Sequence, residues 1–259
     1  MTTGLNMPSF RLEGRTALVT GAGSGLGAAI AEAYAAAGAD IVLLGRTASH
    51  LQEVSGRIAD AGGSALVLCC DVTSDAELRS TIATLPSLDI LVNNAGTNFP
   101  EPFVDVSDEH LDAMLDLNVR ACFVVAQAAV KKMLEDDARV EKGGCIINMS
   151  SQMGHVGSPN RTVYCMTKHA LEGLTKAMAV ELAAQNIRVN SIGPTFTDTP
   201  LVRRIVDTAE KRDFIMSRIP MGRLATLGDI AAAAVYLASP ASAMITGTHL
   251  IVDGGWTAQ

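Results

Sequence analysis

A tyrosine and a lysine stand four positions apart, at Tyr164 and Lys168, near the start of a segment with helical character. Residues at this spacing share one face of a helix, so the phenol and the ammonium can reach the same pocket. An ordinary tyrosine has a pKa of about 10, which is poor for acid–base work near neutral pH. A cation at several ångströms in a partly dry site could lower that pKa by about two to three units. The pair therefore indicates proton exchange between Tyr164 and a substrate oxygen.

A serine lies thirteen residues before this tyrosine, at Ser151, just past the apolar run Cys145–Met149. That run is predicted to be a strand, and open α/β sheets bind ligands at the carboxyl ends of their strands. The Ser151 hydroxyl could hold a substrate carbonyl and stabilise negative charge that develops on its oxygen. Together, the three side chains indicate the interconversion of a carbonyl and an alcohol.

A glycine-rich turn, TGAGSGLG at residues 20–27, follows the first predicted strand and opens the first predicted helix. Glycines allow a tight turn and the close approach of a pyrophosphate, while the helix N-terminus supplies free N–H groups and a favourable dipole. In this position the turn predicts nucleotide binding. The residues expected to contact the nucleotide here are Gly21, Ser24, Gly25, Leu26 and Gly27.

The end of the second predicted strand bears on the choice between NAD and NADP. An acidic residue there would bind the ribose 2′-hydroxyl, whereas an arginine would pair with a 2′-phosphate. The strand Ile41–Leu44 leads into Gly45 and Arg46, and the nearest carboxylate, Asp40, lies at its other end. This pattern favours NADP(H) and leaves NAD(H) open, because Arg46 could instead pack over the adenine ring of either cofactor.

Short, continuously apolar segments alternate with helix-length segments along most of the chain, which is typical of a parallel sheet covered on both faces. The fold expected is α/β: a doubly wound parallel seven-stranded Rossmann sheet with helices on both faces, forming a single domain over residues 1–259. A continuous helix is expected over Asp108–Leu134. A segment at about 195–220 breaks the alternation and could form a mobile substrate lid. The expected strands are Thr16–Thr20, Ile41–Leu44, Ala65–Cys69, Ile90–Asn93, Cys145–Met149, Arg188–Ser191 and His249–Val252.

Composition restricts the classes of function. Of 259 residues, 48% are apolar, and the net charge of -7 argues against general nucleic-acid binding. The five cysteines are an odd number without CxxC or metal-ligand spacing, so reduced thiols, a cytoplasmic protein and no metal site are expected. The first residues lack a secretory pattern, and the apolar runs are too short to suggest a membrane span.

The chain resembles the short-chain dehydrogenase/reductase family, in its compact single-domain type. The similarity runs from Arg15 to Gly255, and it is typical of gluconate 5-dehydrogenase-like or 3-oxoacyl-carrier-protein-reductase-like members. The matching segments are the TGxxxGxG turn, Asp71-Val72, the NNAG segment Asn93–Gly96, Asn118, Ser151, Tyr164, Lys168, Asn190–Pro194 and Thr199.

The resemblance implies a role for each match. Lys168 would hold the nicotinamide ribose and lower the pKa of Tyr164, Ser151 would orient the substrate oxygen, and Asn118 would hold a water in a proton relay. It also implies a homotetramer, with a dimer as the alternative. Further cofactor contacts implied by the family pattern are Asp71, Val72, Asn93, Ala95, Gly96, Tyr164, Lys168, Pro194, Thr197 and Thr199.

The substrate itself is left open between a sugar acid or polyol and a 3-oxoacyl thioester. Thr195 stands where the family usually has glycine, and its side chain could narrow the space beside the nicotinamide or add a hydroxyl to the substrate site. Arg161 could attract a carboxylate, although a surface arginine is the simpler interpretation. A non-catalytic dinucleotide-binding redox sensor is the alternative from another class. The residues expected at the substrate are Ser151, Gln152, Met153, His155, Tyr164 and Thr195.

Overall fold

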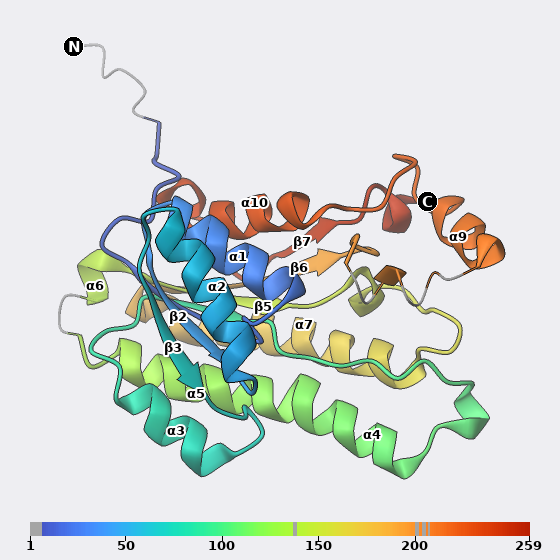
Figure 1. Cartoon of the computed structure of the whole chain (residues 1–259), viewed down its shortest axis with the longest axis horizontal. Coiled ribbons are helices and arrows are strands. Elements are labelled where there is room, and N and C mark those ends of the chain that lie inside the picture. Colours follow the sequence, from blue (N-terminus) through green and yellow to red (C-terminus); the bar gives the residue numbers. More distant parts are fainter. Residues whose placement is uncertain (1–6, 137–138, 200–201, 204–205, 207) are drawn as a thin grey trace.

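The fold is one parallel sheet with helices packed on both of its faces (Figure 1). The computed structural model describes the chain except residues 1–6, 137–138, 200–201, 204–205 and 207. Within the described residues the strand order is β3-β2-β1-β4-β5-β6-β7, and every neighbouring pair is parallel. The predicted fold class is confirmed. The strands are β1 (Thr16–Thr20), β2 (Asp40–Gly45), β3 (Ala65–Cys69), β4 (Ile90–Asn93), β5 (Gly144–Met149), β6 (Ile187–Pro194) and β7 (His249–Val252).

The central strands β1 and β4 are rich in apolar residues because alternate residues enter two different cores. Ala17 and Val19 of β1 face a core that includes Ile30 of α1 (Gly25–Ala36). Leu18 faces the opposite core, which includes Val125 of α5 (Cys122–Met133).

Figure 1 shows α1, α2 (Ala48–Asp60) and α10 (Leu227–Ala238) on one side of the sheet, and α3 (Asp75–Ala83), α4 (Asp108–Leu115), α5 and α7 (Thr162–Leu182) on the other. The shorter elements are η1 (Phe103–Asp105), η2 (Asp116–Ala121), α6 (Arg139–Lys142), η3 (Gln152–Gly154), η4 (Ala183–Gln185), α9 (Ala209–Met216), η5 (Pro240–Ser242) and η6 (Trp256–Ala258).

The order of the strands creates a crevice beside β1. The chain goes from β1 to β2 and β3 on one side, and then crosses to β4 on the other side. Helices that follow adjacent strands therefore turn in opposite directions at the carboxyl ends of β1 and β4, and open α/β sheets bind ligands at such a point. The glycine-rich turn lies at this edge.

The expected continuous helix Asp108–Leu134 is wrong in one respect, because a π-helical segment, η2, interrupts it between α4 and α5. Asn118 lies within η2 and is buried. Single π-turns occur often at functional sites, since the extra residue turns a side chain that a regular helix would place elsewhere.

The same stretch, Asp108–Met133, is long and apolar enough to cross a membrane by length and composition alone. Half of its most apolar window is buried inside the protein, as in a helix that packs on a sheet. Passing this test is therefore weak evidence for a membrane span.

Strand β6 is longer than the predicted Arg188–Ser191, because its pairing with β7 continues to Gly193 and Pro194. This extension places Thr195 directly at the carboxyl edge of the sheet. The segment expected to be a lid begins here and includes α9. Five of its positions, 200–201, 204–205 and 207, lie outside the described residues.

Candidate active site

The glycine-rich turn has the shape that a pyrophosphate needs. A Cβ on Gly27 would lie 2.4 Å from the carbonyl oxygen of Gly21, and Gly21 itself has a positive φ of 63°. Side chains at these two positions would therefore displace the turn. The backbone remains open beside the first N–H groups of α1, so the turn fits a dinucleotide phosphate.

The turn is joined to the end of β4 by a threonine whose role the sequence did not reveal. Thr20 Oγ1 accepts hydrogen bonds from the backbone N–H groups of Asn94 (2.9 Å) and Ala95 (3.0 Å). In return, Asn94 Nδ2 donates to the Thr20 carbonyl oxygen at 2.9 Å. Thr20 and Asn94 thus set the width of the crevice between the two strand ends.

A cavity of about 650 Å³ occupies this edge of the sheet and extends from the glycine-rich turn to the beginning of α7. It brings together most of the side chains singled out from the sequence. The predicted residues that line it are Gly21, Ser24, Gly25, Leu26, Arg46, Asp71, Val72, Ala95, Gly96, Ser151, Gln152, Met153, Tyr164, Lys168, Pro194, Thr195, Thr197 and Thr199.

Four predicted residues, Gly27, Asn93, Asn118 and His155, are not among the residues that line the cavity. Gly27 lies inside the glycine-rich turn, close to the carbonyl oxygen of Gly21. Asn93 is buried between strands, and its amide donates to Asn148 Oδ1 at 3.1 Å. Its neighbour Asn94 lines the cavity instead.

Asn118 is occupied by the loop that follows β4. Its Oδ1 accepts from the Thr97 N–H at 2.8 Å, and its Nδ2 donates to the Thr97 carbonyl oxygen at 2.9 Å and to Thr167 Oγ1 at 3.3 Å. These bonds hold the loop beside α7, so the side chain is a positioning group. The water relay at Asn118 stays a prediction.

Tyr164 and Ser151 face the cavity together near its α7 end. Burial raises the pKa of Tyr164 to about 12, while a hydrogen bond with Ser151 and the charge of Arg161 act in the opposite direction. Tyr164 is therefore a neutral phenol at neutral pH, and it can donate a proton to a substrate oxygen.

Lys168 follows one helical turn later and is 6% exposed. Its Nζ donates to the Met149 carbonyl oxygen at 2.7 Å and lies 5.4 Å from the centroid of the Tyr164 ring. Burial lowers the pKa of Lys168 to about 8, because a charged ammonium is costly inside the protein. The predicted sharing of one pocket by Tyr164 and Lys168 is confirmed.

In this structure the pKa of Tyr164 is raised, and the role of Lys168 in lowering it stays a prediction. The ammonium is directed to a backbone carbonyl, and burial of the phenol outweighs the favourable charges around it. Arg161 is the cation whose charge acts on the phenol. Oxidised nicotinamide, when bound, would add a second positive charge, which would also stabilise the phenolate.

Arg161 lines the cavity near Tyr164. It is partly buried, and burial lowers its pKa. Its guanidinium donates to the Asn160 carbonyl oxygen at 3.0 Å and forms no ion pair with a carboxylate of the described residues. An arginine in this condition can receive an anionic group from a ligand.

Arg46 lies at the other end of the cavity, beyond the carboxyl end of β2. Its side chain is 74% exposed, and its Nη1 is 3.8 Å from Asp71 Oδ2. Hydrogen bonds from Thr73 and the charge of Arg46 outweigh burial and lower the pKa of Asp71. Arg46 is thus free to turn toward a phosphate at small cost, since an exposed pair at this distance contributes little.

The site therefore has a phosphate-binding turn at one end and a proton-donating tyrosine, with a serine and a lysine, at the other. This arrangement, on a doubly wound sheet, defines a dinucleotide-dependent oxidoreductase.

Comparison with known proteins identifies the family. Residues 21–257 match the family model described as "Enoyl-(Acyl carrier protein) reductase". The chain belongs to the short-chain dehydrogenase/reductase family. It is therefore an NAD(P)-dependent enzyme that interconverts secondary alcohols and ketones.

Individual relatives cover nearly the whole chain. D-threitol dehydrogenase from Mycolicibacterium smegmatis is 39% identical over 252 residues, which are 96% of this chain and 95% of the relative. The 2-dehydro-3-deoxy-D-gluconate 5-dehydrogenase of Bacillus subtilis is 37% identical and covers 97% and 98%. A solved gluconate 5-dehydrogenase from Burkholderia cenocepacia, in complex with NADP and tartrate, superposes with a TM-score of 0.91 at 36% identity, covering 96% and 98%.

Proposed function

We propose that this enzyme interconverts the ketone and secondary alcohol of a sugar acid, with NADP(H) as the preferred cofactor and NAD(H) as the alternative. The observation that carries the proposal is Arg161, a cation that lines the substrate end of the cavity and forms no ion pair with a carboxylate in the described part of the chain. A carboxylate substrate would supply that partner, whereas a neutral polyol would leave the guanidinium partly desolvated and unpaired.

The similarity to relatives of both kinds supports a sugar-like substrate. One of the three relatives is named for a neutral polyol, one for a sugar acid, and the third holds tartrate, a hydroxylated dicarboxylate. Arg161 favours the acid over the polyol. A 3-oxoacyl thioester remains the second candidate within the class.

In the proposed reaction the bound dinucleotide supplies or accepts the hydride. Ser151 Oγ, which accepts from the Met153 N–H at 3.1 Å, holds the substrate oxygen through its own hydroxyl proton. Tyr164 passes its proton to that oxygen during reduction and takes it back during oxidation. Arg161 holds the carboxylate and stabilises the phenolate that forms.

The preference for NADP(H) rests on Arg46 and on the absence of a carboxylate in the residues that directly follow β2. The proposed role of Arg46 is to pair with the 2′-phosphate of the adenine ribose. The relative in complex with NADP supports this choice.

The test is a panel of sugar acids, neutral polyols and β-keto esters, assayed with NADP(H) and NAD(H), on the wild type and on Arg161→Gln. We expect Arg161→Gln to raise KM for sugar acids about tenfold, corresponding to about 1.4 kcal/mol, while KM for polyols changes little. Equal effects on both groups would refute the carboxylate contact. Absence of turnover on every sugar acid of the panel would refute this substrate class.

The remaining expectations concern the lid and the assembly. We propose that the segment at about 195–220 is a lid, supported by Phe196 and Val202, which line the cavity. We also propose a cytoplasmic homotetramer without nucleic-acid or membrane partners. Phe123 of α5 is 49% exposed and Val180 of α7 is 83% exposed, so both helices offer apolar side chains for subunit contacts. A mass in solution of four chains would support the tetramer, and a mass of one or two would refute it.

A further inference from the structure

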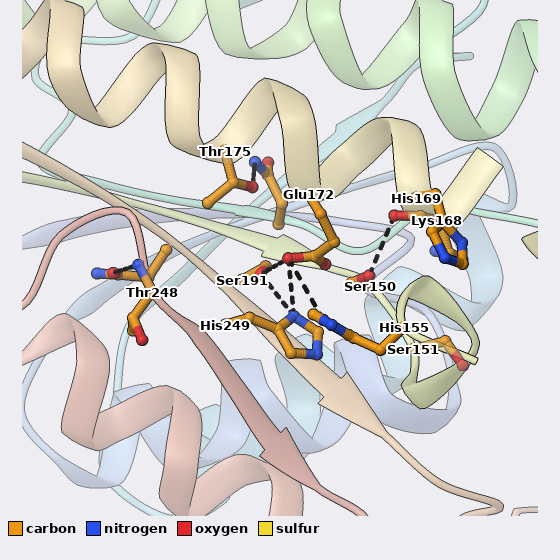
Figure 2. A network of polar contacts seen from close by, with 12 residues as sticks. Ser150, Ser151, His155, Lys168, His169, Glu172, Thr175, Ser191, Thr248 and His249 are labelled. Carbon is orange, nitrogen blue, oxygen red and sulfur yellow. Dashed lines mark hydrogen bonds and ion pairs between the residues drawn. The ribbon is translucent and has the colours of Figure 1, made fainter. Parts of the chain in front are cut away.

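Two histidines and a glutamate converge behind the loop that carries Ser151 (Figure 2). His155 follows η3, Glu172 lies on α7, and His249 is the first residue of β7. One ligand atom from each lies within 4.8 Å of the other two. Figure 2 shows the contacts from both histidines meeting at one oxygen of Glu172.

The distances suit a transition-metal ion. Glu172 Oε2 is 2.9 Å from His249 Nδ1 and 3.8 Å from His155 Nε2. Ligand atoms about 2.0–2.1 Å from a tetrahedral ion lie about 3.3–3.4 Å from one another. The distance from Glu172 to His249 is shorter than this value, and the distance from Glu172 to His155 is longer. Small side-chain rotations would therefore complete the geometry.

We propose that His155, Glu172 and His249 form a binding site for a divalent transition-metal ion, with Zn²⁺ as the ion that its chemistry fits best. Two imidazoles and one carboxylate are a donor set that zinc accepts, whereas Mg²⁺ and Ca²⁺ prefer ligand sets made of oxygen atoms. The spacing of these residues in the sequence follows no metal motif, so only the fold reveals the site.

The burial of the cluster supports the proposal. Glu172 is 6% exposed, and its Oε1 has no hydrogen-bond partner among the described residues; the same holds for Nε2 of the buried His249 side chain. The two imidazole rings are 3.7 Å apart between centroids. Buried polar atoms without partners are costly, and an ion held by both carboxylate oxygens of Glu172 would give Oε1 a partner.

The surroundings also allow an ion to enter and to stay. The side chain of His155 is 33% exposed, which opens the cluster toward solvent. Ser191 Oγ lies 2.8 Å from Glu172 Oε2 and 2.9 Å from His249 Nδ1, so it can orient the ligands or complete the coordination.

The ion would not touch the substrate, and it would affect the active site through the elements that carry its ligands. None of its three ligands lines the cavity. His155, however, is four residues after Ser151, and Glu172 is one helical turn after Lys168. Binding would therefore join β7, α7 and the Ser151 loop, and so restrict the movement of that loop.

The test is titration of the full chain, first stripped with a chelator, with Co²⁺ and with Zn²⁺. We expect one equivalent to bind, with the visible absorption bands of tetrahedral Co²⁺ and no thiolate-to-cobalt charge-transfer band, since the ligands contain no sulfur. We also expect Zn²⁺ to raise the Tm and Mg²⁺ to leave it unchanged. Absence of Co²⁺ and Zn²⁺ binding at millimolar concentration would overturn the proposal.

Variants show whether the ion is held by this cluster. His155→Ala and Glu172→Gln should each weaken binding at least tenfold, and His169→Ala, an exposed histidine on α7, should not. If Glu172→Gln fails to fold, His155→Ala still decides, because a partly exposed loop residue is not needed for the core. Binding that is unchanged in His155→Ala would place the ion elsewhere and refute the site.

Discussion

The buried ammonium of Lys168 should lower the free energy of unfolding at neutral pH. We therefore expect Lys168→Met to change how the free energy of unfolding depends on pH. Burial holds the pKa of Lys168 at about 8, against an ordinary value of 10.5. The difference of about 2.5 units corresponds to about 3 kcal/mol of cost for keeping the charged form inside the folded protein at pH 7.

Between pH 8 and pH 10.5 the unfolded chain binds more protons at this lysine than the folded protein does. The stability of the wild type, relative to that of the variant, therefore rises with pH, by about 2.5 kcal/mol from pH 7 to pH 10. The variant also loses the hydrogen bond from Nζ to the Met149 carbonyl oxygen. That loss costs about 1–3 kcal/mol, but it does not depend on pH.

Urea unfolding of both proteins at pH 7, 8, 9 and 10, at equal protein concentration, measures the change. Lys176→Met, at an exposed position on the same helix, controls for the added methionine. We expect the free-energy difference between the wild type and Lys168→Met to shift in favour of the wild type as pH rises, and the activity of the variant to be lost. A difference that is constant over this range would refute the reasoning about burial.

Three further predictions concern the chemistry and the cofactor. Tyr164→Phe should lower kcat by about 10²- to 10⁴-fold with little change in cofactor Kd, and retained turnover in this variant would remove the tyrosine from its role. Alcohol oxidation by the wild type should accelerate from pH 7 to pH 9, because the pKa of Tyr164 lies above this range. Gly27→Ala should abolish cofactor binding, measured by fluorescence titration, because its Cβ would lie 2.4 Å from the Gly21 carbonyl oxygen, whereas Gly173→Ala, with no heavy atom within 4 Å, should bind normally. Arg46→Ala should weaken NADPH about 10- to 100-fold through loss of a charge-assisted hydrogen bond and leave NADH nearly unchanged; equal weakening of both would contradict the NADP preference.

The features that sequence predicted well are local. Strands β1, β3, β4 and β7 have the predicted bounds, because runs of apolar residues between turn signals depend on nearby residues only. The glycine-rich turn follows from the need for residues without a Cβ, and the shared face of Tyr164 and Lys168 follows from the helical repeat.

The features that sequence missed depend on contacts between distant segments. The π-helical segment around Asn118 interrupts a helix whose apolar pattern is continuous. Asn93 and Asn94 are the same residue type, and only the register of β4 against β5 decides that the first is buried and the second faces the cavity.

By itself, the sequence determined the fold class, the glycine-rich turn and the set of three residues, Ser151, Tyr164 and Lys168, for which proton exchange is proposed. The tertiary structure alone decided the surroundings of that set: burial raises the pKa of Tyr164, Arg161 lines the same cavity, and Lys168 donates to a backbone carbonyl. The tertiary structure alone also brought His155, Glu172 and His249 together. The reason is that pKa values and ligand clusters depend on burial and on distances through space, and residue spacing along the chain specifies neither.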